Sequence, residues 1–375
     1  MYSSVSQYQS IEMAPKSTET ETETETETPV LDIQQLEISS VNRKGEKLEP
    51  IVHGISLSVK SGTMTGLVGE SGSGKTLTTL AILGLLPSSL KVTGGTIKLN
   101  GEEISSMPER KLRALRGKKI SYLFQNYQGS FSPFRSIGKQ LVEALRFSLG
   151  IGPTEAKAVV FTWLERVRLP AERVFSSCCF QLSGGQLQRV ALAAALMVKP
   201  SLIIADEPTT ALDVLSGEQV LDLLSELQRE TGCAVLFISH DLAHVLKRTD
   251  RVAVMYKGRI VEMGPTSALP SAAGHPYTQR LLQARPSLRG TIPERLSVLE
   301  ADVRALPGGS LSLQNGCSFV PYCSCRTQHC EHTPELRNEG AHAVACHEWP
   351  VKEAKPNAER TAASAGEAAR EVVYS

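Results

Sequence analysis

The stretch GESGSGKT, residues Gly69–Thr76, fits the pattern G-x-x-x-x-G-K-[ST] without a mismatch. The short apolar run MTGLVG leads into it, and KTLTTLAILGLL follows with the pattern of a helix. A strand, a glycine-rich loop and a helix in this order let backbone N–H groups surround the phosphates of a nucleotide, whereas an ordinary glycine-rich turn needs no such context. We therefore expect a phosphate loop whose nucleotide-binding residues are Gly69, Glu70, Ser71, Gly72, Ser73, Gly74, Lys75 and Thr76.

Four side chains in and after this loop have expected roles of their own. Lys75 would reach the β and γ phosphates, and the Thr76 hydroxyl would bind Mg²⁺. The run SLIIADEP, residues 201–208, is an apolar strand pattern that ends in Asp206, so it places a carboxylate where it can hold Mg²⁺. Glu207 follows directly and points to the other side of the strand, where it can activate a water molecule. The alternative is a pair of solvated acids at a strand end.

Two more apolar runs end in polar side chains at the same expected edge. FISH ends in His240, and YLFQ ends in Gln125. A lone histidine is more often structural than catalytic, but His240 follows a third strand that reaches this edge, so we favour a catalytic role. Gln125 would sense the γ phosphate and the metal, and the alternative is that it only caps a strand.

Strand-like and helix-like segments alternate along most of the chain. LDIQQLEIS and IVHGISLSV have the alternation of strands, and SLIIADEP, CAVLFISH and RVAVMYKG read as buried strands. Helical patterns such as SGEQVLDLLSELQRE separate them. This order predicts an α/β fold with a largely parallel sheet.

Composition limits the classes of function. The chain has 375 residues with 41% hydrophobic and 21% charged residues, which is typical of a globular protein. Its net charge of +1 does not favour binding to nucleic acid. No run reaches the length of a membrane span, and the N-terminus lacks the features of a secretory signal. We expect a cytoplasmic protein whose eight cysteines do not form structural disulfides.

The two ends of the chain have biased sequences. Residues 1–29 contain repeated Thr-Glu pairs and are expected to be a disordered tail, with a charged docking arm as the alternative. Residues 351–375 are rich in Ala, Glu and basic residues without an apolar stripe, and we expect a second disordered tail there.

A second phosphate-type turn lies far from the first. QLSGGQLQR, residues 181–189, combines a Ser-Gly-Gly turn with a helical pattern. The order GESGSGKT, YLFQ, LSGGQ, LIIADEP, TALD and FISH resembles the nucleotide-binding subunits of ABC transporters from about Leu31 to Met263, and LSGGQ is its most specific part. The resemblance implies a P-loop NTPase cassette with a parallel-sheet core, an antiparallel β subdomain and an inserted helical subdomain at about 130–177, within a nucleotide-binding domain at 30–263.

In that family two such domains pair head to tail, and ATP lies between them. The resemblance implies that Ser183, Gly184, Gly185 and Gln186 contact an ATP held by another domain, and that Asp213 of TALD crosses the interface. The second subunit would be identical or different. Because both acids and His240 are present, we expect Mg²⁺-dependent ATP hydrolysis.

Two stretches depart from the family pattern. The family commonly stacks an aromatic residue on adenine shortly after the first strand, but LEISSVNRKG, residues 36–45, contains none. The LSGGQ segment is the signature of the family. SSCCF, residues 176–180, stands before it, where close relatives usually have Tyr-Pro-His. Cys178 and Cys179 are expected to be packing residues.

The C-terminal region, residues 264–350, resembles the dipeptide, oligopeptide and nickel importer branch. GHPYTQRLL, residues 274–282, is followed by Cys317, Cys323, Cys330 and Cys346 at the branch's spacing. The resemblance suggests a [4Fe–4S] cluster, four thiolates would suit zinc equally, and the alternative is reduced thiols in a small packed subdomain. Cys325 is an extra thiol without an assigned role.

The resulting hypothesis is an ATPase subunit that energises an importer from the cytoplasmic face of the membrane. Its expected partners are a second ATPase subunit, two membrane permeases and an extracytoplasmic substrate-binding protein. The cargo would be a dipeptide or oligopeptide, with nickel or a metal–chelator complex as the alternative. An ATPase that acts on ribosomes or nucleic acid is a weaker alternative because the chain has one cassette and a balanced charge, and the C-terminal features argue against an exporter.

Overall fold

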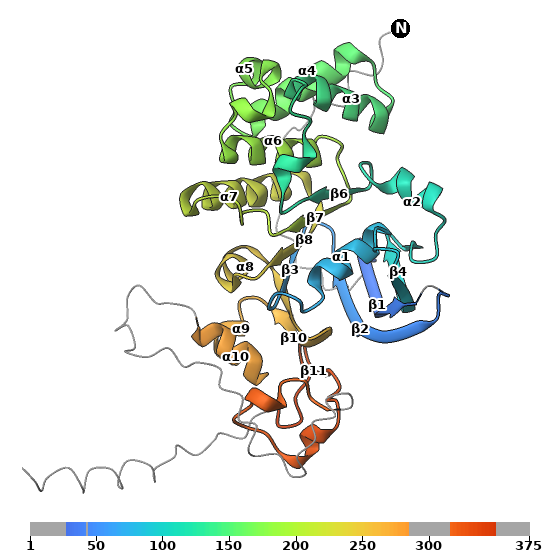
Figure 1. Ribbon diagram of the computed structural model, residues 1–375. Coiled ribbons are helices and arrows are strands. Elements are labelled where there is room, and N and C mark those ends of the chain that lie inside the picture. The colour runs from blue at the N-terminus through green and yellow to red at the C-terminus, as the bar shows by residue number, and fades with distance from the viewer. Residues whose placement is uncertain (1–27, 43, 285–315, 350–375) are drawn as a thin grey trace, which may run out of the picture.

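The computed structural model describes residues 28–42, 44–284 and 316–349 (Figure 1). The expected tails at 1–29 and 351–375 lie outside these residues, apart from residues 28 and 29. The described chain forms an eight-stranded sheet with the order β11-β12-β10-β9-β3-β8-β7-β6 and a four-stranded sheet with the order β2-β1-β4-β5. These two sheets fit the sheet core and the antiparallel β subdomain that the motif order predicts.

The centre of the larger sheet is parallel, as predicted. It contains β3 (Met64–Val68), β6 (Ile120–Leu123), β7 (Leu202–Asp206), β8 (Ala234–Ser239) and β9 (Arg251–Tyr256). The pairs β3–β8, β3–β9, β7–β8 and β6–β7 are all parallel. The carboxyl ends of these strands therefore meet at one edge, which carries the candidate site.

The smaller sheet is antiparallel around its central strand, β1. Its strands are β1 (Leu31–Val41), β2 (Lys47–Val59), β4 (Leu90–Leu99) and β5 (Glu102–Glu103). One hydrophobic core joins this sheet to α1 (Lys75–Leu83) and to one face of the larger sheet, because it contains Leu36 of β1, Ile82 of α1 and Leu236 of β8. The helix after the phosphate loop is thereby held between the two sheets.

Apart from α1 and α2, whose Leu112 lies in the first core, the helices pack on the other face of the larger sheet and at one end. Apolar residues three and four positions apart in α6 (Gly184–Leu196) and α7 (Val214–Thr231) bury one face of each helix in the second core. Figure 1 shows α3, α4 and α5 together at one end of the molecule. The helices are α2 (Glu109–Leu115), α3 (Ile137–Leu149), α4 (Pro153–Arg166), α5 (Ala171–Ser176), α6 (Gly184–Leu196), α7 (Val214–Thr231), α8 (Leu242–Arg248), α9 (Leu269–Ala272) and α10 (Pro276–Gln283).

Short 3₁₀ turns complete the described chain. They are η2 (Tyr127–Ser130), η3 (Cys179–Gln181), η5 (Val320–Tyr322) and η6 (Gln328–Glu331). Within the described ranges, the helices are too short or too polar for any of them to cross a membrane.

The C-terminal residues 316–349 extend the larger sheet. The strand β10 (Arg259–Pro265) pairs with β9 on one side and β12 (His342–Val344) on the other, and β11 (Arg337–Glu339) pairs with β12. All of these pairs are antiparallel. The cysteine-bearing segment is therefore continuous with the sheet that carries the candidate site.

A buried carboxylate strengthens this connection. Glu262 on β10 has no exposed surface. Its Oε1 accepts the Gly274 N–H at 2.7 Å, and its Oε2 accepts the His275 N–H at 3.0 Å. The His342 Nε2 lies 2.8 Å from Oε1. One carboxylate thus ties β10 to β12 and to the start of α10, as a buried charge needs such partners to be tolerated.

His275 makes the stability of this region depend on pH. Its Nδ1 accepts the Tyr277 N–H at 3.1 Å and caps α10, so a proton on Nδ1 would remove the cap. Burial lowers the pKa of His275 from 6.5 to about 4. Between these values the unfolded chain binds a proton that the folded chain does not, so the free energy of unfolding falls as pH falls through this window.

We predict that His275→Asn reduces this pH dependence, because asparagine can cap a helix but does not titrate. In urea unfolding at about pH 7 and about pH 5, the wild type should lose about 2 kcal/mol more than the variant. Equal losses in the two proteins would contradict the prediction.

Candidate active site

The phosphate-loop residues lie between β3 and α1, close to β9. Gly69 has a φ of 154°, and a Cβ atom there would lie 2.0 Å from the Met255 carbonyl oxygen, so only glycine fits. The Lys75 Nζ donates to the carbonyl oxygens of Gly69 at 2.7 Å and Glu70 at 2.8 Å. Burial lowers the pKa of Lys75, and the negative charges of Glu207 and Asp206 oppose this shift.

Asp206 ends β7 and is almost fully buried. Burial raises the pKa of its carboxyl group, whereas a hydrogen bond from Tyr122 and the nearby Lys75 and Thr76 lower it. The Tyr122 hydroxyl, on the neighbouring strand β6, donates to Asp206 Oδ2 at 2.6 Å. Asp206, Thr76 and Lys75 are thus close enough to influence one another, as a shared phosphate and Mg²⁺ site requires.

Glu207 diverges from Asp206 and contacts the other two polar strand ends. Its Oε1 lies 3.1 Å from His240 Nδ1, and its Oε2 accepts a hydrogen bond from Gln125 Nε2 at 3.2 Å. Its φ of 47° is unusual for a residue other than glycine. Such backbone strain is found mostly at functional sites. The structure therefore brings together the acid, the histidine and the glutamine that the sequence placed at the ends of three strands.

The signature residues occupy a different place. Ser183 caps α6: its Oγ accepts the Gln186 N–H at 3.3 Å, and the Gln186 Oε1 accepts the Ser183 N–H at 3.0 Å. Gly185 lies beside Ser216, which donates its N–H to Asp213 Oδ1 at 3.0 Å. These hydrogen bonds lower the pKa of the Asp213 carboxyl group. Gly184 lies beside the Asp213 loop too, within van der Waals reach of Leu212.

Within the described residues, Ser183–Gln186 and Asp213, which we call the signature group, have no polar contact with the phosphate loop. In the part of the chain that the structure describes, no hydrogen bond or ion pair joins Ser183–Gln186 or Asp213 to residues 69–76. One chain therefore carries two separate groups of candidate nucleotide-binding residues.

The five cysteines of the C-terminal region gather around one small cavity. Cys317, Cys323, Cys330 and Cys346 line it together with Cys325. Burial raises the pKa of Cys317 and Cys346, and raises that of Cys323 to about 11. Among the described residues, however, no three or more His, Cys, Asp or Glu side chains are arranged to hold a metal ion. The expected metal site is not confirmed.

Comparison with known proteins identifies the family. The model of the ABC transporter family matches residues 52–210, and that of the oligopeptide/dipeptide transporter C-terminal region matches residues 261–330. The chain is 41% identical to the probable D,D-dipeptide transport ATP-binding protein DdpD of Escherichia coli, over 86% of this chain and 96% of the relative. The chain belongs to the ATP-binding subunits of ABC transporters.

Other comparisons agree with this family assignment. The chain is 37% identical to the oligopeptide transport ATP-binding protein OppD of Salmonella typhimurium, over 82% of this chain and 90% of the relative. A solved ATP-binding cassette, dimeric and bound to ADP and phosphate after hydrolysis, superposes with a TM-score of 0.55 at 27% identity. That alignment covers 63% of this chain and 98% of the cassette.

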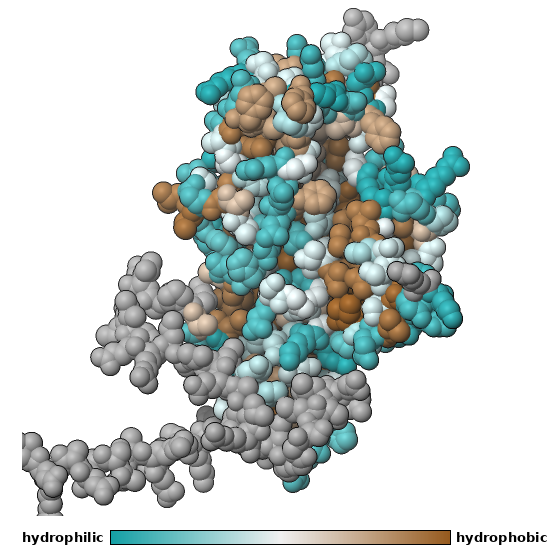
Figure 2. All heavy atoms as spheres, viewed as in Figure 1, coloured by the Kyte–Doolittle hydropathy of each residue, from teal (hydrophilic) through white to brown (hydrophobic). Residues whose placement is uncertain are grey.

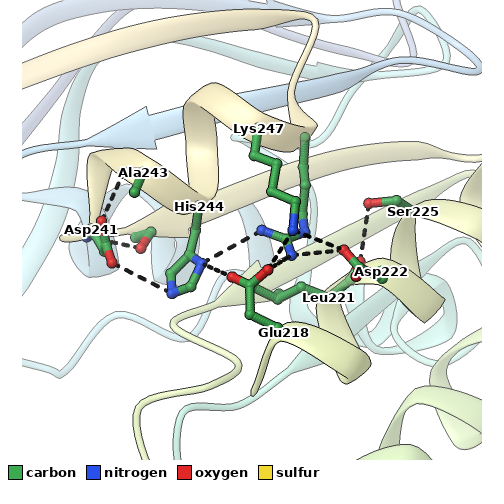
Figure 3. A network of polar contacts seen from close by, with 10 residues as sticks. Glu218, Leu221, Asp222, Ser225, Asp241, Ala243, His244 and Lys247 are labelled. Carbon is green, nitrogen blue, oxygen red and sulfur yellow. Dashed lines mark hydrogen bonds and ion pairs between the residues drawn. The ribbon is translucent and has the colours of Figure 1, made fainter. Parts of the chain in front are cut away.

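A polar network between α7 and α8 was not predicted from the sequence (Figure 3). Glu218 on α7 accepts from Arg248 Nη2 at 2.6 Å and from Lys247 Nζ at 2.5 Å, and lies 3.1 Å from His244 Nδ1. The hydrogen bonds from Arg248 and Lys247 lower the pKa of Glu218 to about 2. The Arg248 side chain is only 3% exposed and also donates to Asp222. The network joins the helix after Asp213 to the helix after His240.

Sequence reasoning also missed Tyr122. The phenol of a tyrosine within a strand gives no signal of its own, and in YLFQ only Gln125 was expected to reach the site, because it ends the run. The hydrogen bond from the Tyr122 hydroxyl holds the Asp206 carboxylate in one orientation.

We predict that Tyr122→Phe weakens the response of ATP hydrolysis to Mg²⁺. Loss of the hydrogen bond would leave the buried Asp206 less well oriented and harder to ionise, so half-saturation should need about threefold to tenfold more Mg²⁺. The measurement is a Mg²⁺ titration of the ATPase rate at fixed ATP. Tyr322→Phe is the matched control. A Tyr122→Phe curve that overlays the wild type would refute the role of the phenol.

Proposed function

We propose that this chain hydrolyses ATP to energise the import of dipeptides or oligopeptides. The contact of Glu207 with both Gln125 and His240, beside Asp206 and the phosphate loop, supports hydrolysis rather than binding alone. The peptide cargo rests on the names of the relatives and on the matching C-terminal region.

The proposed reaction is transfer of the γ-phosphoryl group to water. The loop residues 69–76 hold the phosphates, with Lys75 on the β and γ phosphates, and Thr76, Asp206 and Gln125 would hold Mg²⁺. When bound, Mg²⁺ neutralises charge on the phosphates. Glu207 orients the water and takes its proton as the bond to the β–γ bridging oxygen breaks, which releases ADP and phosphate. His240, beside Glu207, would stabilise the γ phosphate.

A complete site would need a second ATPase subunit. The separation of the signature group from the phosphate loop supports this proposal, because Ser183–Gln186 and Asp213 then serve an ATP molecule held by the other subunit. The N-cap hydroxyl and the backbone N–H groups that begin α6 suit the γ phosphate. The partner would be a second copy or a related chain.

The remaining partners would be two permeases and an extracytoplasmic substrate-binding protein. We propose that the permeases dock on the helical subdomain at about 130–177, at the cytoplasmic face of the membrane. Apolar side chains are exposed there, including Phe134 at 93% and Phe147 at 78%, and Figure 2 shows apolar residues at the surface over the α3–α5 end. We also propose the boundaries 30–263 for the nucleotide-binding domain and 264–350 for the C-terminal region.

The test uses cells that carry the chain in its native membrane. We predict that mild extraction recovers it with two permeases, a second ATPase and a binding protein, and that the cells take up a labelled dipeptide. Glu207→Gln should keep these partners and nucleotide binding but reduce uptake and hydrolysis by about a hundredfold or more, because the water then lacks its base.

Two results would change the proposal. Uptake of labelled nickel in place of the dipeptide would assign the metal cargo, and recovery with ribosomes or nucleic acid alone would overturn the importer. Glu207→Gln with normal uptake would remove Glu207 from its proposed role while leaving the partners in place.

We further propose that Cys317, Cys323, Cys330 and Cys346 bind an iron–sulfur cluster or zinc. Their convergence on one cavity and the ligand chemistry of thiolates support this proposal. The bound cluster or zinc would stabilise the fold of the C-terminal region and would take no part in ATP hydrolysis.

Anaerobic purification followed by iron, zinc and acid-labile sulfide analysis tests this proposal. We expect either about four irons with matching sulfide or about one zinc per chain, and loss of the metal when Cys330 and Cys346 are both replaced by serine. Cys178 and Cys179, replaced together, serve as the control. Metal-free protein would reject the site.

A further inference from the structure

A tyrosine of the C-terminal region touches the phosphate loop. Tyr277 lies on α10 and is only 2% exposed. Its hydroxyl oxygen accepts a hydrogen bond from the backbone N–H of Glu70 at 3.0 Å. The two residues are 207 positions apart, and Figure 1 shows α10 near β10.

With this contact, both polar atoms of the peptide group between Gly69 and Glu70 have a hydrogen-bond partner. The Gly69 carbonyl and the Glu70 N–H belong to the same trans peptide, so they point in opposite directions. Lys75 Nζ binds the carbonyl at 2.7 Å, and Tyr277 binds the N–H. A rotation of this peptide plane would lose both hydrogen bonds and turn the N–H toward the Lys75 ammonium.

The Tyr277 ring is itself held firmly. It packs against Tyr256 of β9 with ring centroids 4.5 Å apart and against Phe319 at 5.6 Å. The backbone N–H of Tyr277 donates to the His275 Nδ1, and the backbone N–H of His275 donates in turn to the buried Glu262. Because the phenol is already ordered by packing, its hydrogen bond costs little additional side-chain entropy.

The orientation of the first loop peptide matters for the ligand. The glycine-rich loop binds phosphates through backbone N–H groups that must converge, so the direction of each peptide is part of the site. Lys75 can reach a phosphate with a defined geometry only if the loop that surrounds it keeps one conformation.

We propose that Tyr277 is a positioning residue for nucleotide: the C-terminal region orients the Gly69–Glu70 peptide and thereby sets the affinity of the phosphate loop for ATP and ADP. This inference rests on the proposed ATP site. It assigns to the C-terminal region a direct part in nucleotide binding, in addition to any role in assembly.

The test replaces the phenol of Tyr277 in the full-length chain. Tyr277→Phe should raise the Kd for ATP and for ADP about fivefold to tenfold, which is the effect of one lost hydrogen bond that leaves a donor unpaired. At saturating ATP, kcat should change by less than about twofold, since the groups that act on the water are untouched. Tyr322→Phe removes a phenol from the same aromatic group and should leave both Kd values unchanged.

Hydrogen exchange separates this role from a merely structural one. In the wild type the Glu70 amide should be protected from exchange without nucleotide, and Tyr277→Phe should expose it while α10 keeps its protection. An unprotected Glu70 amide in the wild type would overturn the inference whether or not the variant folds.

The outcomes also separate the two proposals. A wild-type chain that binds no ATP would remove the proposed function. A wild-type chain that binds ATP, with Tyr277→Phe and Tyr322→Phe both within twofold of it, would remove this inference alone.

Discussion

A buried ammonium group organises the candidate site. Lys75 lies among the carbonyl oxygens of its own loop and within reach of the charges of Asp206 and Glu207. A buried charge without such partners would be neutralised, so the loop, the strand ends and the lysine depend on one another. The contact of Gly69 with Met255 extends this dependence to β9, because a larger residue would push the loop off the sheet.

The sequence was sufficient to predict the sheet edge. Asp206, His240 and Gln125 each end an apolar run, and the carboxyl ends of parallel strands must meet, so their proximity follows from topology. Tyr122 and Tyr277 could not be predicted in the same way. Their hydroxyls find partners 84 and 207 residues away, and nothing local distinguishes a phenol that binds a polar group from one that packs. The strands β11 and β12 are three residues each, too short to show alternation.

The two separated groups of site residues are linked inside the chain. Asp213 caps the N-terminus of α7, and His240 directly precedes Asp241, the N-cap of α8. The Glu218 network joins these two helices (Figure 3). Arg248 is almost fully buried in that network, so its ion pairs are screened less than surface pairs. The Arg248 side chain thus links the helix that Asp213 caps to the helix that follows His240.

The C-terminal region is part of the same folded unit as the ATP site. Strand pairing with β10, the Glu262 carboxylate and the Tyr277 hydroxyl connect it to the cassette through three kinds of interaction. Phe319 packs against Tyr277 and also lines the cavity with the cysteines. A change at these thiols that moved Phe319 would reach the phosphate loop through one aromatic contact and one hydrogen bond.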